Sequence, residues 1–276
     1  MQNINLLTAA IKAAVDAGKA ILDIYQTDFE VDYKEDRSPL TLADKKAHDI
    51  ISAHLAVFDI PLLSEEGQAI PYAARRGWET LWIVDPLDGT KEFVKRNGEF
   101  TVNIALVTAN QPVLGVVFAP VREVLYFALQ DLGAYKMDAM DAVVALCERI
   151  SRGACTGDDL TEHGQSLPLE LAKDTPYTSV GSRSRATEAL EDFVEQKRRE
   201  FGTIDFIPAG SSLKLCLVAE GRAHIYPRLA PTMEWDTAAG HAVVACAGAR
   251  IYDHASGNPL QYNKEDLLNP WFIAER

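Results

Sequence analysis

Residues 82–93 read WIVDPLDGTKEF, and the order of residue types in this stretch predicts the local fold. An apolar run leads into Asp85, a second carboxylate follows at Asp88, and Gly89 and Thr90 come next. The apolar run is typical of a buried strand, the proline interrupts it because proline has a fixed φ and no N–H, and Gly89 and Thr90 suit the start of a helix. We therefore expect a strand that ends in two carboxylates and passes directly into a helix.

Two carboxylates at the end of one strand repel each other, so both stay ionised only if a cation lies between them. A site of oxygen ligands with no convergent His or Cys favours magnesium or manganese over zinc. The carbonyl of Leu87 is a further candidate ligand, and the backbone amides of Gly89 and Thr90 suit a phosphate. Taken alone, the motif is explained equally well by an Asx-type turn and a helix cap.

The segments around this motif divide the first half of the chain into helices and short strands. Apolar residues recur every three or four positions from Leu7 to Tyr25, which predicts an amphipathic helix, and a second helix is expected from about Thr41, whose hydroxyl can cap it. The short apolar runs LWIVD, TVNIALVT, VLGVVFAP and EVLYFALQ predict an antiparallel meander. Residues 136–175 contain a possible strand at AVVALC (142–147), and we assign this segment no chemistry.

The second half of the chain alternates strands with helices. Strands are expected at TSVG, IDFIP and AHIYPR, and a polar helix from about Arg185 to Glu200. GSSLKLCLVAEG has serine at its start and Gly221 at its end, as a capped helix does, and WDTAAGHAVVACAG predicts a helix opened by Asp236. This alternation predicts a second layered α/β unit.

Two further acidic motifs lie upstream of the central strand. LLSEEG (62–67) places Glu65 and Glu66 after a short apolar run, and one of them can face the metal site while the other meets solvent, because adjacent strand residues point to opposite faces. SPLTLAD (38–44) places Asp44 three residues after Thr41, as a helix-capping box requires. The alternative is that Asp44 reaches the site and orients a hydroxyl or a water.

Asp236, Lys214 and Arg228 are the candidates in the second half. In EWDTAAGHA, Asp236 precedes a helix, where its carboxylate can cap the first turn or join a metal cluster. Arg228 can form a two-pronged contact with phosphate or can be an ordinary surface charge, and Lys214 adds another cation. The sequence has no GxSxG, Walker or GxGxxG motif, which argues against a serine hydrolase, a common kinase and a dinucleotide oxidoreductase.

The composition limits the partners. The formal net charge is −13 and the sequence pI is about 4.9, which argues against a nucleic-acid duplex because the phosphate backbone attracts Lys and Arg. Solubility explains such acidity most simply, and clustered carboxylates that hold cations are the alternative. No apolar run predicts a transmembrane segment, and the cysteines show no zinc or dithiol spacing. We expect a cytoplasmic protein with free thiols, and peripheral attachment to the inner face of the cell membrane is the alternative location.

Together these segments resemble the inositol monophosphatase superfamily, whose pattern is an acidic pair, DPxDGT after a strand and WDxAAG near the C-terminus. GEFTVNIALV, GSSLKLCLVAEG and YPR are similar to its CysQ-type branch, the 3'(2'),5'-bisphosphate nucleotidases. The resemblance implies a mixed α/β fold, the layered αβαβα sandwich of the sugar-phosphatase type. We expect residues 1–175 to hold two helices, the antiparallel sheet and most metal ligands, and residues 176–276 to complete the metal and nucleotide site.

The resemblance also implies a role for each motif. The family's metal ligands, which hold about two or three Mg²⁺ ions, are matched by Glu65, Asp85, the Leu87 carbonyl, Asp88 and Asp236. The expected catalytic residues, which position and activate the attacking water, are Asp44 and Thr90. The expected substrate contacts are Gly89, Thr90, Ser182, Arg183, Ser211, Lys214 and Arg228. Of these, the last three match positions that hold the nucleotide's remaining phosphate and ribose.

The implied activity is a magnesium-dependent, lithium-sensitive phosphomonoesterase. Its expected substrate is an adenosine bisphosphate, 3'-phosphoadenosine 5'-phosphate, a by-product of sulfur assimilation that would be hydrolysed to AMP and phosphate. An inositol phosphatase or a fructose-bisphosphatase-like sugar phosphatase would use the same site, and a non-catalytic nucleotide-binding module is a remoter alternative. The chain departs from the branch at Arg185, where a histidine is often found near the base-binding side.

Overall fold

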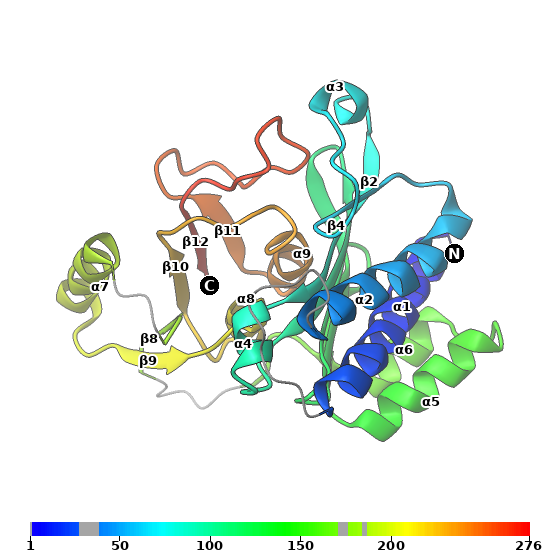
Figure 1. Ribbon diagram of the computed structural model, residues 1–276. Helices are drawn as coiled ribbons and strands as arrows, with labels where there is room; N and C mark the ends of the chain where they lie inside the picture. Colours follow the sequence, from blue (N-terminus) through cyan, green and yellow to red (C-terminus); the bar gives the residue numbers. More distant parts are fainter. Residues whose placement is uncertain (1, 28–38, 171–175, 184–186) are drawn as a thin grey trace.

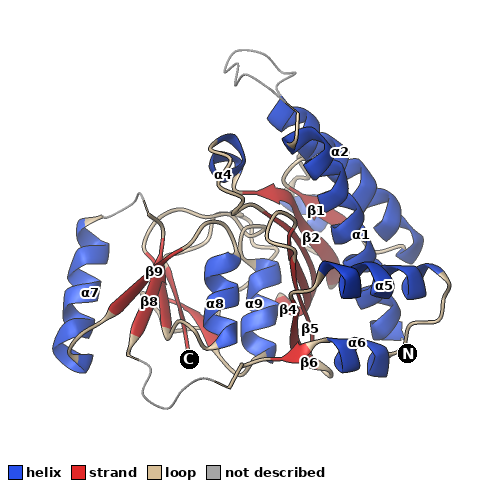
Figure 2. Cartoon of the chain, turned by 90° about the horizontal axis from the view of Figure 1, so that it is seen from below, coloured by secondary structure: helices blue, strands red, loops and turns tan. Residues whose placement is uncertain are grey.

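The computed structural model describes residues 2–27, 39–170, 176–183 and 187–276, which fold into five layers (Figure 1). Helices α1 (Gln2–Tyr25) and α2 (Pro39–Leu55) cover one face of a seven-stranded sheet. Helices α8 (Leu213–Glu220) and α9 (Ala238–Cys246) lie between that sheet and a five-stranded sheet, and α7 (Glu188–Phe201) covers the outer face of the second sheet. Figure 2 shows the same order of layers from below. The predicted αβαβα sandwich is confirmed.

The seven-stranded sheet contains the predicted meander. Its strands lie in chain order: β1 (Leu62–Ser64), β2 (Thr80–Asp88), β3 (Thr101–Thr108), β4 (Gln111–Ala119), β5 (Val124–Leu129), β6 (Gly133–Met137) and β7 (Gln165–Ser166). β1 pairs with β2 in parallel, and each later pair is antiparallel. Two short helices, α3 (Tyr72–Arg75) and α4 (Thr90–Val94), stand before and after β2. As predicted, a strand that ends in Asp85 and Asp88 passes directly into a helix.

Helices α1 and α2 form the layer beside the first sheet. Leu7, Ile11 and Val15 are fully buried at intervals of four residues, as the amphipathic pattern predicts. α2 begins at Pro39 and ends in the short 3-10 helix η1 (Ala56–Phe58). Proline is favoured at a first helical position because its φ is already helical and it has no N–H to leave unpaired. The helix thus begins within two residues of the predicted start, but Thr41 lies inside the first turn, so the prediction that Thr41 is the N-cap residue is wrong.

Residues 142–147 belong to a helix, α5 (Met140–Ser151), so the possible strand predicted at AVVALC is wrong. Val143, Leu146 and Cys147 are buried, and Ile150 packs against the same core. These positions recur every three or four residues, which is helical spacing, and this pattern outweighs the local strand preference of two adjacent valines. α5 packs against α1, and α6 (Gly157–His163) follows it (Figure 2).

The five-stranded sheet confirms the second α/β unit. Its order is β11-β12-β10-β8-β9, with bounds β8 (Thr178–Gly181), β9 (Asp205–Pro208), β10 (Ile225–Arg228), β11 (Arg250–Asp253) and β12 (Phe272–Glu275). β8 runs parallel to β9 and β10, and β12 runs antiparallel to β10 and β11. The polar helix of this half, α7, begins at Glu188. Arg185, its expected start, lies outside the described residues.

α9 packs unusually closely on the first sheet. A Cβ on Gly115 of β4 would lie 2.3 Å from the carbonyl oxygen of Ala239, so only glycine permits this approach. The facing residues Ala238, Ala239 and Ala242 are small and fully or almost fully buried. The contact holds α9 against the sheet that carries Asp85, and Asp236 lies just before this helix.

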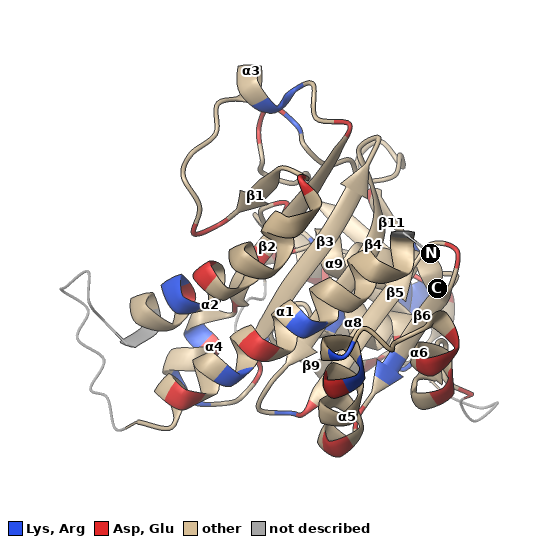
Figure 3. Ribbon diagram, turned by 90° about the vertical axis from the view of Figure 1, so that its right-hand side faces the viewer, with Lys and Arg blue, Asp and Glu red and all other residues tan. Residues whose placement is uncertain are grey.

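The surface and the thiols agree with the composition. Acidic and basic residues are interspersed along α1, α2 and α5 (Figure 3). All four cysteines are free thiols, as predicted. Among the helices of the described residues, none combines the length and the apolar character that a bilayer crossing requires.

Candidate active site

A β-bulge reshapes the end of β2. Asp85 pairs with Asn103 of β3, and Asp88 pairs with Thr101, so β2 uses one residue more than β3 between these pairs. On a regular strand, two residues three positions apart would point to opposite faces of the sheet, because side chains alternate along a strand. The bulge directs both toward the face covered by α8 and α9, where Ser212 contacts Asp88.

Asp85 is buried, and its two carboxylate oxygens have different surroundings. Oδ1 accepts a hydrogen bond of 3.0 Å from the backbone N–H of Leu87, which is the Asx-type turn considered above. Oδ2 is buried and has no hydrogen-bond partner among the described residues. A buried oxygen without a donor costs free energy that the turn does not return. The turn therefore explains the position of Oδ1 but not that of Oδ2, which is left for a ligand.

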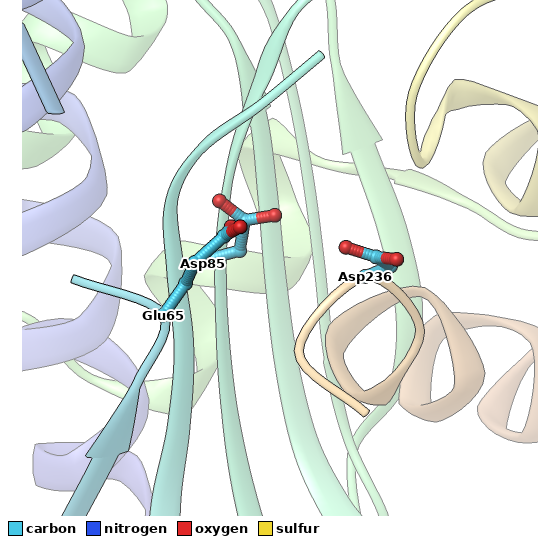
Figure 4. A group of neighbouring side chains, drawn as sticks. All are labelled: Glu65, Asp85 and Asp236. Atoms are coloured by element: carbon cyan, nitrogen blue, oxygen red, sulfur yellow. The ribbon is translucent and has the colours of Figure 1, made fainter. Parts of the chain in front are cut away.

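Three carboxylates from distant parts of the chain converge at this point (Figure 4). Glu65 comes from the turn after β1, Asp85 from β2 and Asp236 from the turn before α9. One oxygen from each lies within 4.8 Å of the other two. Figure 4 shows the side chains facing a common space from two sides. Leu87 and Asp88, the other predicted ligands, line the same pocket.

Burial and mutual repulsion raise the pKa values of these carboxylates. Burial first, and then the charge of Asp88, raise the pKa of Asp236 to about 7. The same two causes, in the same order, raise the pKa of Glu65 and raise that of Asp85 well above its usual range. Buried carboxylates that share a site cannot all ionise without a counter-charge. A hard divalent cation with oxygen ligands would supply that counter-charge, so these residues fit magnesium.

Asp88 differs from its neighbours because donors already surround its carboxylate. Its Oδ2 lies 2.9 Å from the hydroxyl of Ser212, 3.3 Å from the side-chain amide of Asn103 and 3.4 Å from the hydroxyl of Thr101. The hydroxyl of Ser211 donates to the Asp88 backbone carbonyl at 2.9 Å. These contacts fix the end of β2 in place.

The two serines therefore do not cap α8. Ser212 occupies the N-cap position, but its side chain makes no capping hydrogen bond, so the predicted serine cap is wrong. Its hydroxyl lies 2.9 Å from the Asp236 carbonyl oxygen as well as from Asp88. Gly221 ends the helix in the left-handed conformation, with φ of 81°, as predicted.

Asp236 does not cap α9. Thr237 occupies the N-cap position, and the helix begins at Ala238. The Oδ2 of Asp236 accepts a hydrogen bond of 2.8 Å from the backbone N–H of Met233, which closes the turn before the helix. The capping alternative for Asp236 is therefore wrong, and its carboxylate belongs to the acidic cluster.

Asp44 and Thr90, the expected catalytic residues, lie near the cluster. Asp44 is buried on α2, and burial, followed by the charges of Glu66 and Glu65, raises its pKa to about 8. Because α2 begins at Pro39, Asp44 is not part of a capping box at the helix start. Thr90 is the first residue of α4 and lines the pocket.

The cluster opens into a pocket of about 310 Å³, the size of a small-molecule site. Lys214 and Arg228 bring positive charge to its lining. Nζ of the buried Lys214 donates to the Ser211 carbonyl at 2.6 Å and lies 5.6 Å from the centre of the Tyr226 ring, and burial lowers the pKa of this lysine to about 8. Arg228 donates to the Pro231 carbonyl at 2.7 Å, while its Nε is buried without a partner in the described part of the chain. Arg228 is thus more than a surface charge.

Gly89 lets two pocket segments meet. Its φ is +97°, and a Cβ at this position would lie 2.0 Å from the Oγ of Ser211. Any other residue would be strained and would displace that serine. The contact joins the turn between β2 and α4 to the loop before α8.

The structure brings together most of the predicted substrate contacts, with one exception. The pocket lining includes Gly89, Thr90, Ser182, Ser211, Lys214 and Arg228. Arg183 is not part of this lining, and its guanidinium donates to both carboxylate oxygens of Glu99 and to the Pro208 carbonyl. Arg185 lies outside the described residues, so its relation to the pocket is not described.

Several site residues escaped the sequence interpretation. Asn103 and Ser212 hold Asp88, and Glu92, Tyr226 and Thr232 contribute to the pocket lining. Asn103 carried a usable signal, because it is a polar residue inside the otherwise apolar run TVNIALV. Thr232 carried none, since it belongs to a turn whose position only the fold determines.

Comparisons with known proteins agree with this fold and site. The chain matches the inositol monophosphatase family over residues 2–274. It is 42% identical over 272 residues to the 3'(2'),5'-bisphosphate nucleotidase CysQ of Escherichia coli K12, covering 97% of this chain and 98% of that protein. The protein of the same name from Buchnera aphidicola is 37% identical, covering 98% and 93%. The crystal structure of CysQ from Bacteroides thetaiotaomicron, described as a bacterial member of the inositol monophosphatase family, is similar with a TM-score of 0.87 at 50% identity, covering 97% and 95%.

Proposed function

This chain belongs to the inositol monophosphatase family, and from that premise we propose that it is a divalent-cation-dependent 3'(2'),5'-bisphosphate nucleotidase. Its substrate would be 3'-phosphoadenosine 5'-phosphate, and its products AMP and phosphate. The names of relatives that resemble the chain over nearly its whole length support this substrate. The pocket supports it as well, because carboxylates for cations and side chains for anions occur together there.

The observation that carries the proposal is the unpaired Oδ2 of Asp85 inside the group of three carboxylates. We propose that Glu65, Asp85, the Leu87 carbonyl, Asp88 and Asp236 hold Mg²⁺, with about two or three ions in the complete site. When bound, the ions would polarise the phosphate ester and provide an activated water as nucleophile. The raised pKa values of the carboxylates imply that cation binding must displace protons, so it should weaken below neutral pH.

Thr90 and Asp44 are the residues that we propose to orient the attacking water. Thr90 stands at the start of α4 and lines the pocket, and a threonine hydroxyl both donates and accepts hydrogen bonds. Asp44 lies beside the glutamates after β1, and a carboxylate there can accept the proton of a neighbouring hydroxyl group. This pair would hold the water in line with the scissile bond, which supplies the orientation part of catalysis.

The remaining pocket residues would bind the rest of the substrate. The amides of Gly89 and Thr90 suit the scissile phosphate, next to the carboxylates. Lys214, Arg228 and Ser211 would hold the second phosphate and the ribose, and Ser182 completes this wall. An inositol monophosphate has no second phosphate, so it would leave Lys214 and Arg228 without an anion. This is the reason for preferring the nucleotide.

Release of inorganic phosphate tests the proposal directly. With Mg²⁺ present, 3'-phosphoadenosine 5'-phosphate should be hydrolysed with a kcat/KM at least about tenfold above that of inositol 1-phosphate, corresponding to one charged contact with the second phosphate. EDTA should abolish the reaction, and Li⁺ should inhibit it. A preference for inositol 1-phosphate would assign the chain to the inositol phosphatases instead, and turnover that persists in EDTA would contradict the cation requirement.

A further inference from the structure

Glu99 lies between α4 and β3, and its side chain is only 3% exposed. Its carboxylate accepts hydrogen bonds from both terminal nitrogens of Arg183, one of them at 2.7 Å, and from Arg122 at 2.5 Å. Gly210 packs against it, because a Cβ on this glycine would lie 3.1 Å from the Oε2 of Glu99. One buried carboxylate outside the pocket thus accepts hydrogen bonds from two separate segments of the chain and contacts a third.

Two of these segments lead directly to the pocket. Arg183 follows Ser182, and Gly210 precedes Ser211; Ser182, Gly210 and Ser211 all line the pocket. The packing around Gly210 is close, because a Cβ on this glycine would lie 2.9 Å from the Cβ of Glu99. Any displacement of Glu99 must therefore move the loop before α8, which carries the proposed phosphate contacts.

The charge at Glu99 is well compensated. Burial on its own raises the pKa of this carboxyl, but the hydrogen bonds and charge of Arg183, together with the charge of Arg122, lower it below its usual value. A carboxylate that accepts a two-pronged contact from arginine is held in distance and in plane, which a single ion pair does not achieve. The guanidinium of Arg183 is occupied by these contacts, because it donates to Glu99 and to the Pro208 carbonyl.

We propose that Glu99 is a positioning residue for the wall that holds the substrate's second phosphate, and that Arg183 acts through Glu99 and not by touching the substrate. Glu99 comes from the half of the chain that carries Asp85, whereas Arg183 and Gly210 come from the loops of the second sheet. The contact between Glu99 and Arg183 therefore fixes the position of the loops that carry Ser182 and Ser211 relative to the acidic cluster. This inference rests on the proposed nucleotidase function.

If Glu99 acted only through its charge, the change of KM in a Glu99 variant would have the opposite sign. Glu99 is negative and lies near Lys214, whose protonated form it favours. If Glu99 acted only through its charge, its loss would strengthen the binding of an anionic substrate and lower KM. If it acts by holding the wall, its loss would raise KM and leave kcat nearly unchanged, because the acidic cluster is untouched.

The test compares three variants in steady-state kinetics with Mg²⁺. Glu99→Gln keeps the shape but places an NH₂ group against the arginine donors, so KM for 3'-phosphoadenosine 5'-phosphate should rise about tenfold while kcat stays within about twofold. Arg183→Lys keeps the charge but loses the two-pronged contact, and it should raise KM in the same direction. Arg122→Gln is the matched control, because Arg122 binds the same carboxylate from the turn between β4 and β5 and does not line the pocket; its KM should stay within about twofold.

A substrate with one phosphate separates this role from general damage. For adenosine 3'-monophosphate, which lacks the second phosphate, Glu99→Gln should change KM by less than about threefold. An unchanged or lowered KM for the bisphosphate in both Glu99→Gln and Arg183→Lys would refute the positioning role while leaving the nucleotidase function intact. If Glu99→Gln does not fold, Arg183→Lys alone decides the question. If the unmodified chain hydrolyses neither adenosine phosphate, the proposed function and this inference both fail.

Discussion

A single buried carboxylate and a member of the acidic cluster lie on either side of Trp235, and their oxygens have opposite surroundings. Glu234 is fully buried, and its oxygens accept hydrogen bonds from the backbone N–H groups of Asn263 at 2.6 Å and Lys264 at 3.0 Å, with the Lys264 ammonium as a further partner. Two residues later, Asp236 faces Glu65 and Asp85, and these carboxylates repel one another. Glu234 has hydrogen-bond donors around its carboxylate, whereas in the cluster the Oδ2 of Asp85 has no donor among the described residues.

The network around Glu234 extends to helix α3. Arg75 of α3 is 2% exposed and donates to the Asn263 side chain at 2.9 Å and to the carbonyls of Lys264 and Glu265 at 2.5 and 2.9 Å. The Asn263 side chain in turn donates to the Arg75 carbonyl at 2.8 Å. The turn that carries Asp236 is thus tied to the connection between Glu65 and Asp85. Glu234, whose oxygens accept hydrogen bonds from several donors, thus serves the structure. Asp85, whose Oδ2 lacks a donor, is free to bind a ligand.

The largest expected effect comes from changing Asp85 to Asn. The variant removes the unpaired anionic oxygen, so Mg²⁺-dependent phosphate release should fall on the order of 10³-fold. Its fold should persist, because the amide oxygen can still accept the N–H of Leu87. Circular dichroism with a phosphate-release assay measures both outcomes. An Asp85→Asn protein that retains full turnover would remove Asp85 from the ligand set.

Glu234→Ala should lower the thermal stability of the protein more than its rate of phosphate release, the reverse of Asp85→Asn. It leaves the buried N–H of Asn263 and the ammonium of Lys264 without their acceptor, at a cost of about 3 kcal/mol. Melting temperature in saturating Mg²⁺ should fall by roughly 6–12 °C. Lys264→Met is the control: its side chain is 28% exposed, so removing it should cost at most about 1 kcal/mol. Equal losses in both variants would mean that the backbone donors of this network contribute little.

Ser212→Ala tests the intermediate case, Asp88, whose carboxylate has donors and yet faces the pocket. Losing the hydroxyl that lies between Asp88 and the Asp236 carbonyl should weaken Mg²⁺ binding about tenfold in titration calorimetry. Ser256→Ala, on an exposed turn, should leave the affinity unchanged. If the two variants bind Mg²⁺ alike, the donors around Asp88 have no role in holding the cation.

The smallest expected effect is a pH dependence of stability in EDTA. The folded-state pKa values of Asp236 and Asp44, about 7 and about 8, lie above the usual aspartate value of 3.8. The folded state therefore keeps protons that the unfolded state has lost, and the stability that these groups contribute below about pH 4 disappears as the pH rises toward 8. Between pH 5 and pH 8 the melting temperature of the cation-free protein should fall by about 5 °C. Asp236→Asn should reduce this slope, and an unchanged slope would mean that Asp236 is not held protonated.

The sequence predicted the elements far better than their connections. The strand before Asp85, the antiparallel meander and the layered second half follow from apolar patterns, and the structure has them all. Residues 142–147 were misassigned because two adjacent valines suggest a strand in a short window, while the helical spacing emerges only when Ile150 is included. Local windows cannot decide such cases.

Side-chain partners were less predictable, for a physical reason. Asp236 and the serines before α8 stand where capping residues stand in most sequences, and only the approach of β2 to these turns gives them other partners. Glu99 and Arg183 are 84 residues apart, and no local pattern pairs them. Each acidic motif alone had a turn, capping or surface explanation, and only the resemblance to the family implied that Glu65, Asp85 and Asp236 belong together, as they do in the structure.

The separation of these three carboxylates along the chain also orders events during synthesis. Glu65 and Asp85 leave the ribosome only 20 residues apart, but Asp236 follows Asp85 by 151 residues. The segment that secures its turn, from Asn263 to Asn269, follows later still. A nascent chain that stops before Asp236 therefore lacks one side of the acidic cluster, and it acquires the full set of proposed cation ligands only after that segment has emerged.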